Sequence, residues 1–228
     1  MMYDLLLQLP LFQGLSNEQL TLILEKVPFH FKKFRNNEYL VHEGDTCNEV
    51  IFILSGRIRM VTPALKSSVL IVEDFVGPFT VPFLNLFGTE TASRCNIYAQ
   101  GQVGAMVLDK ANFLNLIGMN QVIMVHAMNM LSAVAQKQHT ILDLLAYSDP
   151  DLRLASWLLT YTSYSAMNIV IDAEINDWCN MLSIDESALL KATRILTDEK
   201  CIEYQNGKLK LIDRYGLRTF VSRNDVQK

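Results

Sequence analysis

Basic side chains gather in the last part of this chain, from Lys191 onward. Between residues 149 and 186, Arg153 is the only basic residue in a segment rich in aspartate and glutamate. Downstream, basic residues outnumber acidic ones, and they are Lys191, Arg194, Lys200, Lys208, Lys210, Arg214, Arg218, Arg223 and Lys228. Clustered Lys and Arg neutralise phosphates, which is the chemistry that binds a polyanion. The pattern predicts a nucleic-acid surface in the C-terminal third.

The elements around this basic cluster predict a winged helix-turn-helix. A short strand at 169–171 precedes a helix that runs through Trp178 to Leu182, for which Asp172 is a candidate N-cap. Ser183-Ile184-Asp185 is a tight turn, and Asp185 can cap the next helix, 186–200. Asn206-Gly207 between two alternating runs is a strong hairpin signal. We therefore expect the second helix to enter the major groove and the hairpin to form the wing.

Other chemistry finds little support in the sequence. No Ser-His-Asp set, phosphate loop or metal pair can be placed with sensible spacing, so we do not expect an enzyme. The four cysteines are scattered, which indicates isolated thiols in a reducing cytoplasm. The four histidines form no spaced ligand pair. We expect no metal and no cofactor.

A long apolar stretch, Ala111–Ala146, contains no proline and predicts a helix much longer than the usual 8–20 residues or so. Its apolar residues recur at three- and four-residue steps, as in a helix seam. We expect this seam to pair with a second copy of the chain, and the alternative is one buried core helix. The expected dimer interface comprises Met124, Met128, Leu131, Ala135, Gln138, Leu142 and Leu145.

Short strands separated by turn residues follow one another from Phe29 to Asp109, which predicts an antiparallel barrel or jelly roll. Between two of them, residues 75–88 form an apolar loop with two prolines and two glycines, for which we expect a short helical piece. Such a loop is either a lid over a pocket or a plug in the core.

The order and spacing of several segments resemble the cyclic-AMP-receptor-like (Crp/Fnr) family of bacterial transcription regulators. They are Leu11 to Ser16, Glu43-Gly44-Asp45, Ile51 to Gly56, Leu108-Asp109-Lys110 and Asp151 to Leu159. The resemblance implies an α+β fold in three parts. These are an effector-sensing antiparallel β-barrel or jelly roll at 1–110, a long dimerisation helix at 111–147 and a winged helix-turn-helix DNA-binding domain at 148–228.

The resemblance fails at the family's cyclic-nucleotide cassette. Phe75-Val76-Gly77 matches the lead-in, but Pro78 stands where the ribose-binding glutamate belongs. Arg94 falls one residue away from the phosphate-binding position, and a one-residue slip on a strand reverses the side chain. We therefore expect no cyclic AMP. The candidate pocket for an unidentified small-molecule effector comprises Gly77, Phe79, Val81, Phe83, Leu86, Arg94, Gln138 and His139. The family's iron–sulfur cysteines are missing, and His126 is a lone candidate for haem.

By position in the family motif, the base-reading residues fall on Glu186, Ser187 and Lys191. A carboxylate accepts from cytosine, and a lysine or hydroxyl contacts bases or phosphate. We add Arg194, Lys208 and Lys210 to the expected DNA-binding set. The resemblance implies a cytoplasmic homodimeric regulator whose expected partners are double-stranded DNA and RNA polymerase, with no membrane. The alternative is a ligand-binding or protein-interaction module whose winged helix no longer reads DNA.

Overall fold

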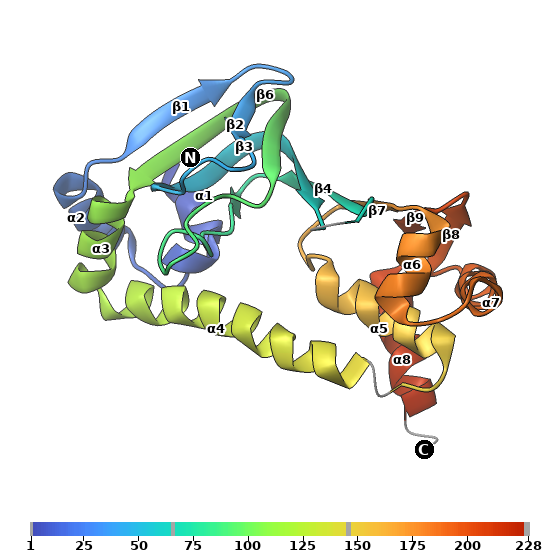
Figure 1. Ribbon diagram of the computed structural model, residues 1–228. Coiled ribbons are helices and arrows are strands. Elements are labelled where there is room, and N and C mark those ends of the chain that lie inside the picture. The colour runs from blue at the N-terminus through green and yellow to red at the C-terminus, as the bar shows by residue number, and fades with distance from the viewer. Residues whose placement is uncertain (1, 65–66, 145–146, 226–228) are drawn as a thin grey trace. The chain divides into compact units, whose positions relative to one another are not determined.

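The chain folds into two compact units, seen in a computed structural model (Figure 1). The model describes residues 2–64, 67–144 and 147–225, and for residues 2, 138–144 and 225 it describes the backbone only. The first unit comprises residues 1–59 and 75–134, and the second comprises 60–74 and 135–228. The division into three domains made from the sequence remains a prediction.

The first unit begins with helices α1 (Met2–Gln8), η1 (Pro10–Phe12) and α2 (Asn17–Lys26). The sequence Ser16-Asn17-Glu18-Gln19 predicts a capping box at the start of α2, and this is confirmed: Ser16 Oγ accepts from the Gln19 amide, and Gln19 Oε1 accepts from the Ser16 amide. This reciprocal pair satisfies two amides that the first helical turn leaves open. Phe12 and Leu20 are buried and pack on the β domain in one apolar core.

The antiparallel β domain of this unit is built around β6 (Asn96–Asp109), which pairs with β1 (His30–Phe34) and β2 (Tyr39–Val41). Strand β3 (Glu49–Pro63) pairs with β5 (Phe79–Thr80). The fold class predicted from the sequence is confirmed, although the strands are longer than expected. Strand β3 passes through Gly56, which has φ +92° and lies so close to Gln102 O that a Cβ would collide with it. The short helical piece expected within 75–88 was wrong, because Phe79 and Thr80 are held in the β3 ladder instead.

The apolar stretch predicted as one helix is two helices. They are α3 (Lys110–Met119) and α4 (Gln121–Leu144), and Asn120 between them is extended at φ −141°. The Asn120 side chain accepts from the amides of Val122 and Ile123 at 2.9 and 3.4 Å, so it caps α4. Asparagine competes with the helix for its own backbone amides, which explains the break.

The second unit contains the predicted winged helix-turn-helix. Its helices are α5 (Pro150–Tyr161), α6 (Ile175–Leu182), α7 (Glu186–Asp198) and α8 (Arg214–Asp225). Its sheet runs in the order β4 (Leu70–Val76), β7 (Asn168–Asp172), β9 (Lys208–Leu211) and β8 (Ile202–Gln205). The predicted Asn206-Gly207 turn joins β8 to β9, and both residues have positive φ, as this turn type requires. The expected Asp172 cap was wrong: Asp172 ends β7, and α6 starts after Glu174.

Candidate nucleic-acid interface and sensor site

Helix α7 presents one polar face to solvent. Glu186, Ser187, Lys191 and Arg194 are exposed on it, at spacings that place them on adjacent turns. The opposite face is buried in the core of the second unit through Leu189, Ala192, Thr193 and Leu196. Within the described residues, neither the Lys191 nor the Arg194 side chain forms a hydrogen bond or an ion pair. Both cations therefore remain available to a ligand.

The start of α7 is fixed by Asp185, the predicted cap, which is confirmed. Its Oδ1 accepts from the Ala188 amide at 2.7 Å and from Ser187 Oγ at 2.7 Å. These hydrogen bonds, that of Ala188 first, lower the pKa of the Asp185 carboxyl. Ser187 thus donates its hydroxyl hydrogen within the protein, and it keeps its lone pairs for an incoming donor.

The wing carries its two predicted basic residues on its outer face. Lys208 Nζ lies 3.5 Å from Asp172 Oδ2, and Lys210 Nζ lies 4.0 Å from Glu203 Oε2. All four groups are largely exposed, and exposed pairs of this kind contribute roughly 0–1 kcal/mol. The pairs can therefore open at little cost when a phosphate approaches.

Arg153 fixes the turn between α6 and α7, a role that was not predicted. Its guanidinium donates to Leu182 O at 2.7 Å and Ser183 O at 3.1 Å, and also to Tyr147 O. One side chain on α5 thereby satisfies carbonyls at the end of α6 and in the segment that precedes α5. Its isolation in an acidic segment was the only signal in the sequence.

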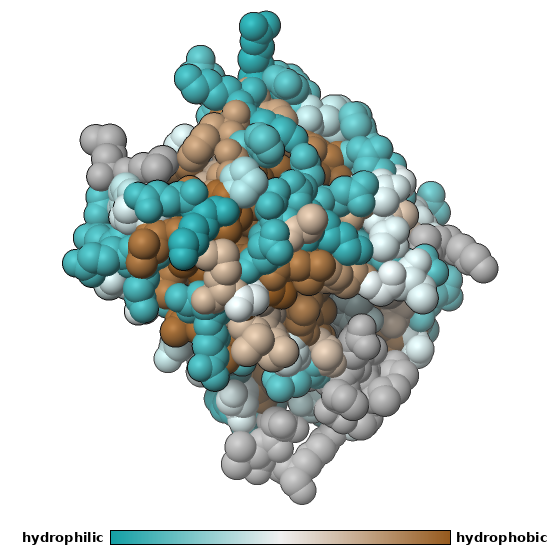
Figure 2. Space-filling view, turned by 90° about the vertical axis from the view of Figure 1, so that its left-hand side faces the viewer, coloured by the Kyte–Doolittle hydropathy of each residue, from teal (hydrophilic) through white to brown (hydrophobic). Residues whose placement is uncertain are grey.

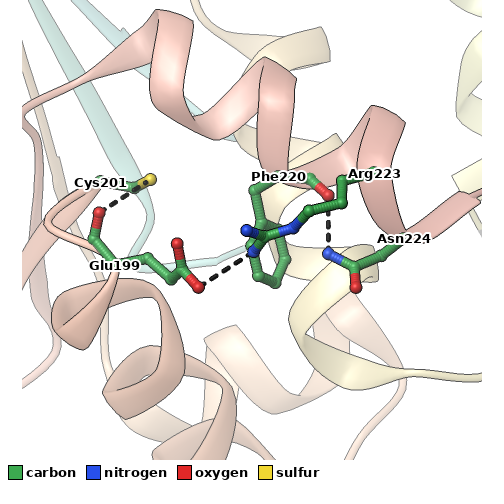
Figure 3. A network of polar contacts seen from close by, with 5 residues as sticks. All are labelled: Glu199, Cys201, Phe220, Arg223 and Asn224. Carbon is green, nitrogen blue, oxygen red and sulfur yellow. Dashed lines mark hydrogen bonds and ion pairs between the residues drawn. The ribbon is translucent and has the colours of Figure 1, made fainter.

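The far end of α7 is held by the C-terminal helix (Figure 3). Arg223 on α8 pairs with Glu199 at 3.0 Å and lies over the ring of Phe220. The buried Cys201 thiol donates to Glu199 O at 3.6 Å, and burial raises its pKa. Helix α7 is held mainly by its Asp185 cap and by its buried face, since the exposed Arg223–Glu199 pair contributes roughly 0–1 kcal/mol.

The exposed side of α4 carries several apolar side chains of the predicted interface. Met128 is 59% exposed, Leu131 is 38% exposed and Ala135 is also exposed, whereas Met124 is half-buried. Ile123 and Ala127 are buried on the side that faces the first unit's core. Gln138, Leu142 and Leu145 of the predicted interface lie outside the residues whose side chains are described. More generally, apolar residues reach the surface between hydrophilic ones on the face shown in Figure 2.

The apolar loop after β4 packs largely into the protein. Phe83 and Leu86 are buried in the core beside Phe113, and Val81 is also buried. Phe79 is half-buried and stacks on Phe75, with ring centroids 4.2 Å apart. The Thr80 hydroxyl is buried without a hydrogen-bond partner among the described residues. The loop therefore fills the core through Phe83 and Leu86. It leaves one buried hydroxyl, that of Thr80, without a hydrogen-bond partner among the described residues.

Comparison with known proteins identifies the fold to which this chain is similar. A family model of the cyclic nucleotide-binding domain matches residues 31–120. The catabolite activator protein of Thermus thermophilus is similar over 94% of this chain and 99% of its own, with TM-score 0.54 and 16% identity. This chain has the Crp/Fnr fold. The resemblance drawn from the sequence is thereby confirmed for the fold.

Two further solved structures share the Crp/Fnr fold. A CooA variant from Carboxydothermus hydrogenoformans matches with TM-score 0.50 and 18% identity, over 90% of this chain and 92% of its own. A protein from Eubacterium rectale described as a transcriptional regulator of the Crp/Fnr family matches with TM-score 0.50 and 15% identity, over 93% and 98%. No curated protein sequence matches this chain significantly.

Within this Crp/Fnr fold, the predicted effector residues Gly77 and Arg94 have different surroundings. Gly77 donates its amide to Gly56 O at 3.0 Å, and a Cβ on Gly77 would meet the backbone of Leu54 and Ser55. Arg94 is exposed in the loop before β6, so the strand-slip reason for its orientation does not apply. Gln138 and His139 lie outside the described side chains. The effector pocket remains a prediction.

The described residues hold no cluster of His, Cys, Asp and Glu suited to a metal ion. His126 instead places Nδ1 at 3.2 Å from Leu11 O. None of the described helices is both long and apolar enough to cross a membrane.

Proposed function

We propose that this protein is a sequence-specific, double-stranded-DNA-binding transcription regulator of the Crp/Fnr type. The observation that carries this proposal is the exposed face of α7, with the Lys191 and Arg194 side chains unpaired and the helix supported by its Asp185 cap and its buried face. A recognition helix must present its side chains to base edges from a rigid support. We further propose that the protein works in the cytoplasm and contacts RNA polymerase when bound to DNA.

The residues divide by chemistry. Lys191 can donate to guanine O6 and N7, and Glu186 can accept from the cytosine amino group. Lys208 and Lys210 on the wing exchange their carboxylate partners for backbone phosphates. Arg194, one turn beyond Lys191, adds a phosphate or base contact. Lys191 and Glu186 would therefore discriminate between base sequences, and the wing lysines would position the protein on the DNA backbone.

The exposed stripe on α4 supports a homodimer. Met128 and Leu131 are apolar and exposed, and a second copy of the helix would remove them from water. A dimer carries two recognition helices, which reach successive major grooves about 34–36 Å apart. The preferred operator is then a two-fold-related sequence.

We propose that cyclic AMP is not the effector. Pro78 supplies neither a carboxylate nor an amide hydrogen at the expected ribose site, and the described Arg94 is exposed on a loop. Calorimetry with cyclic AMP and cyclic GMP should show no saturable heat at micromolar ligand.

Selection from random duplexes, followed by fluorescence anisotropy across a salt series, tests the DNA proposal. The selected duplex should bind about 10³-fold or more tightly than a scrambled duplex of equal length. Equal affinity for both would indicate a merely cationic surface. If neither duplex binds at low salt, with or without cell-extract metabolites, the alternative of a protein-interaction module is favoured.

A further inference from the structure

A hairpin from the N-terminal half of the sequence, residues 60–74, belongs to the second unit. Strand β4 pairs antiparallel with β7 over five Cα partners, from Leu70 opposite Asp172 to Asp74 opposite Asn168. The sheet of the winged helix-turn-helix therefore runs β4–β7–β9–β8 (Figure 1). One of its four strands comes from a segment about a hundred residues away in the sequence, as the register of Glu73 with Ile169 illustrates.

The hairpin also fills the core of this unit. Val69 is 1% exposed and Ile71 is 8% exposed, and both pack in the cluster that contains Trp157, Trp178 and Leu209. Alternate residues of β4, Leu70 and Val72, point to the outer face, since strand side chains alternate. Withdrawal of the hairpin would open this core to water.

The tip of the hairpin holds the first helix of the helix-turn-helix. The Ser68 amide donates to Asp177 Oδ2 at 2.7 Å, and Ser68 Oγ accepts from the Glu174 amide at 2.8 Å. Glu174 is the N-cap residue of α6, and Asp177 lies in its first turn. The start of α6 is thus defined by a residue that precedes it by more than a hundred positions.

The base of the hairpin is held by two buried carboxylates. Glu73 accepts from the Ser163 amide at 2.5 Å and from Ser163 Oγ at 3.3 Å. Asp74 accepts from Asn168 Nδ2 at 3.1 Å, and its carbonyl accepts from the Met167 amide. Buried acids persist only where such partners satisfy them, so this end of β4 is built to lie against the loop before β7.

We propose that the 60–74 hairpin is a donated strand of the DNA-binding unit and that the paired form is the one that binds DNA. The hairpin covers the β7 edge, whereas the wing lies at the other edge, and Glu186, Lys191 and Arg194 stay exposed while it is paired. The chain therefore enters the second unit along β3 and returns to the first unit along β4. It enters the second unit again along α4. A shift of β3 and β4 would therefore act on α6 through the two hydrogen bonds of Ser68. The consequence for DNA rests on the proposed function.

Cross-linking in the full-length chain tests the pairing without DNA. Val72 and Val170 are Cα partners, and facing residues in neighbouring strands lie about 4.5–5.5 Å apart, within disulfide range. Val72→Cys with Val170→Cys should form a 72–170 disulfide on oxidation, identified by peptide mass spectrometry. The matched control is Val72→Cys with Lys210→Cys, because Lys210 is the partner of Val170 one strand further away. Equal yields from both pairs, or no 72–170 peptide, would overturn the strand assignment.

Hydrogen exchange provides a second readout. Ile71→Ser removes an inward side chain, and Leu70→Ser changes the neighbouring outward one, which is 40% exposed. Exchange in peptides covering 168–172 should rise at least tenfold in Ile71→Ser and less than threefold in Leu70→Ser. Unchanged protection in Ile71→Ser contradicts the donated strand.

Anisotropy then compares the oxidised and reduced forms of the Val72→Cys, Val170→Cys chain on its selected duplex. Affinities within threefold support the paired form as the DNA-binding form. A loss above tenfold on oxidation overturns that assignment. If neither form nor the unmutated chain binds any duplex, the proposed function fails, and the disulfide still decides the pairing.

Discussion

The indole of Trp178 donates to the carbonyl oxygen of Gly207 at 2.8 Å, which ties helix α6 to the turn of the wing. Trp178 is fully buried, and the Gly207 backbone approaches Ala173 so closely that a Cβ on Gly207 would collide with it. The helix-turn-helix and the wing are therefore one rigid body, joined at a glycine that the turn requires.

Trp178→Phe should destabilise the second unit by about 1–3 kcal/mol, because the buried Gly207 carbonyl loses its donor. Trp157→Phe is the matched control, since the described structure shows no hydrogen bond from the Trp157 indole. Urea unfolding of each variant, followed by far-ultraviolet circular dichroism, gives the comparison. Equal losses for the two substitutions would mean that the lost ring volume, and not the hydrogen bond, decides.

Arg153→Met should destabilise the turn between α6 and α7 by about 1.5–3 kcal/mol, because a charged donor to three carbonyls is lost. Arg153→Lys should recover only part of this, since an ammonium cannot reproduce the planar fork that reaches three carbonyls. Hydrogen exchange of peptides covering 180–188 is the measurement. Arg194→Met, which removes an exposed guanidinium, is the control and should leave this exchange unchanged.

Lys191→Ala should weaken operator binding and reduce the discrimination against a scrambled duplex by about 1–3 kcal/mol if Lys191 contacts guanine. If it contacts only phosphate, both duplexes should weaken equally and the salt slope should fall by about one unit. Glu186→Ala should raise non-specific binding, because a carboxylate repels phosphates at wrong sites. Anisotropy at several salt concentrations separates these outcomes, and no change in either variant would argue against α7 as the reading helix.

Leu131→Asp should convert the proposed dimer to monomers, because it places a charge in the apolar seam. Burying an unpaired charge costs on the order of several kcal/mol. Asn129→Asp adds the same charge on an exposed position of α4 outside the predicted seam and should leave the dimer intact. Sedimentation velocity measures both. A dimer that survives Leu131→Asp would show that another face mediates association.

Stability of the second unit should fall as pH rises because of Glu73. Burial raises the pKa of this carboxyl, against the opposing effects of the Ser163 hydrogen bonds and the Arg214 and Lys137 charges. The folded state then holds a proton that the unfolded chain releases near its usual pKa of about 4.3. Stability is therefore full below that value and declines until pH passes the raised folded pKa.

Glu73→Gln should remove this decline, so the variant should gain stability relative to the wild type as pH rises through the window. Both tryptophans of the chain lie in the second unit, so their fluorescence during urea unfolding reports on it. Glu203→Gln, an exposed wing carboxylate, is the control and should follow the wild type. A constant difference between Glu73→Gln and the wild type at every pH would contradict the buried titration.

Several local features could be read from the sequence because their causes lie within a few residues. The Ser16–Gln19 capping box, the Asp185 cap and the Asn206-Gly207 turn each depend on short-range hydrogen bonds or backbone angles. The winged helix-turn-helix could be predicted for the same reason, since it is a series of such signals in a fixed order. Asn120 was missed although it is also local, because apolar periodicity on both sides concealed a single capping residue.

The tertiary structure alone decided which distant segments meet. The apolar run at 69–72 is one of the short strands expected between Phe29 and Asp109, but nothing in it identifies β7 as the partner, since the ladder is formed by backbone groups that every residue carries. The role of Arg153 likewise depends on carbonyls from two other segments. Glu73 looks like an ordinary surface acid in the sequence, and only the packing of Ser163 and Arg214 around it makes it a buried one.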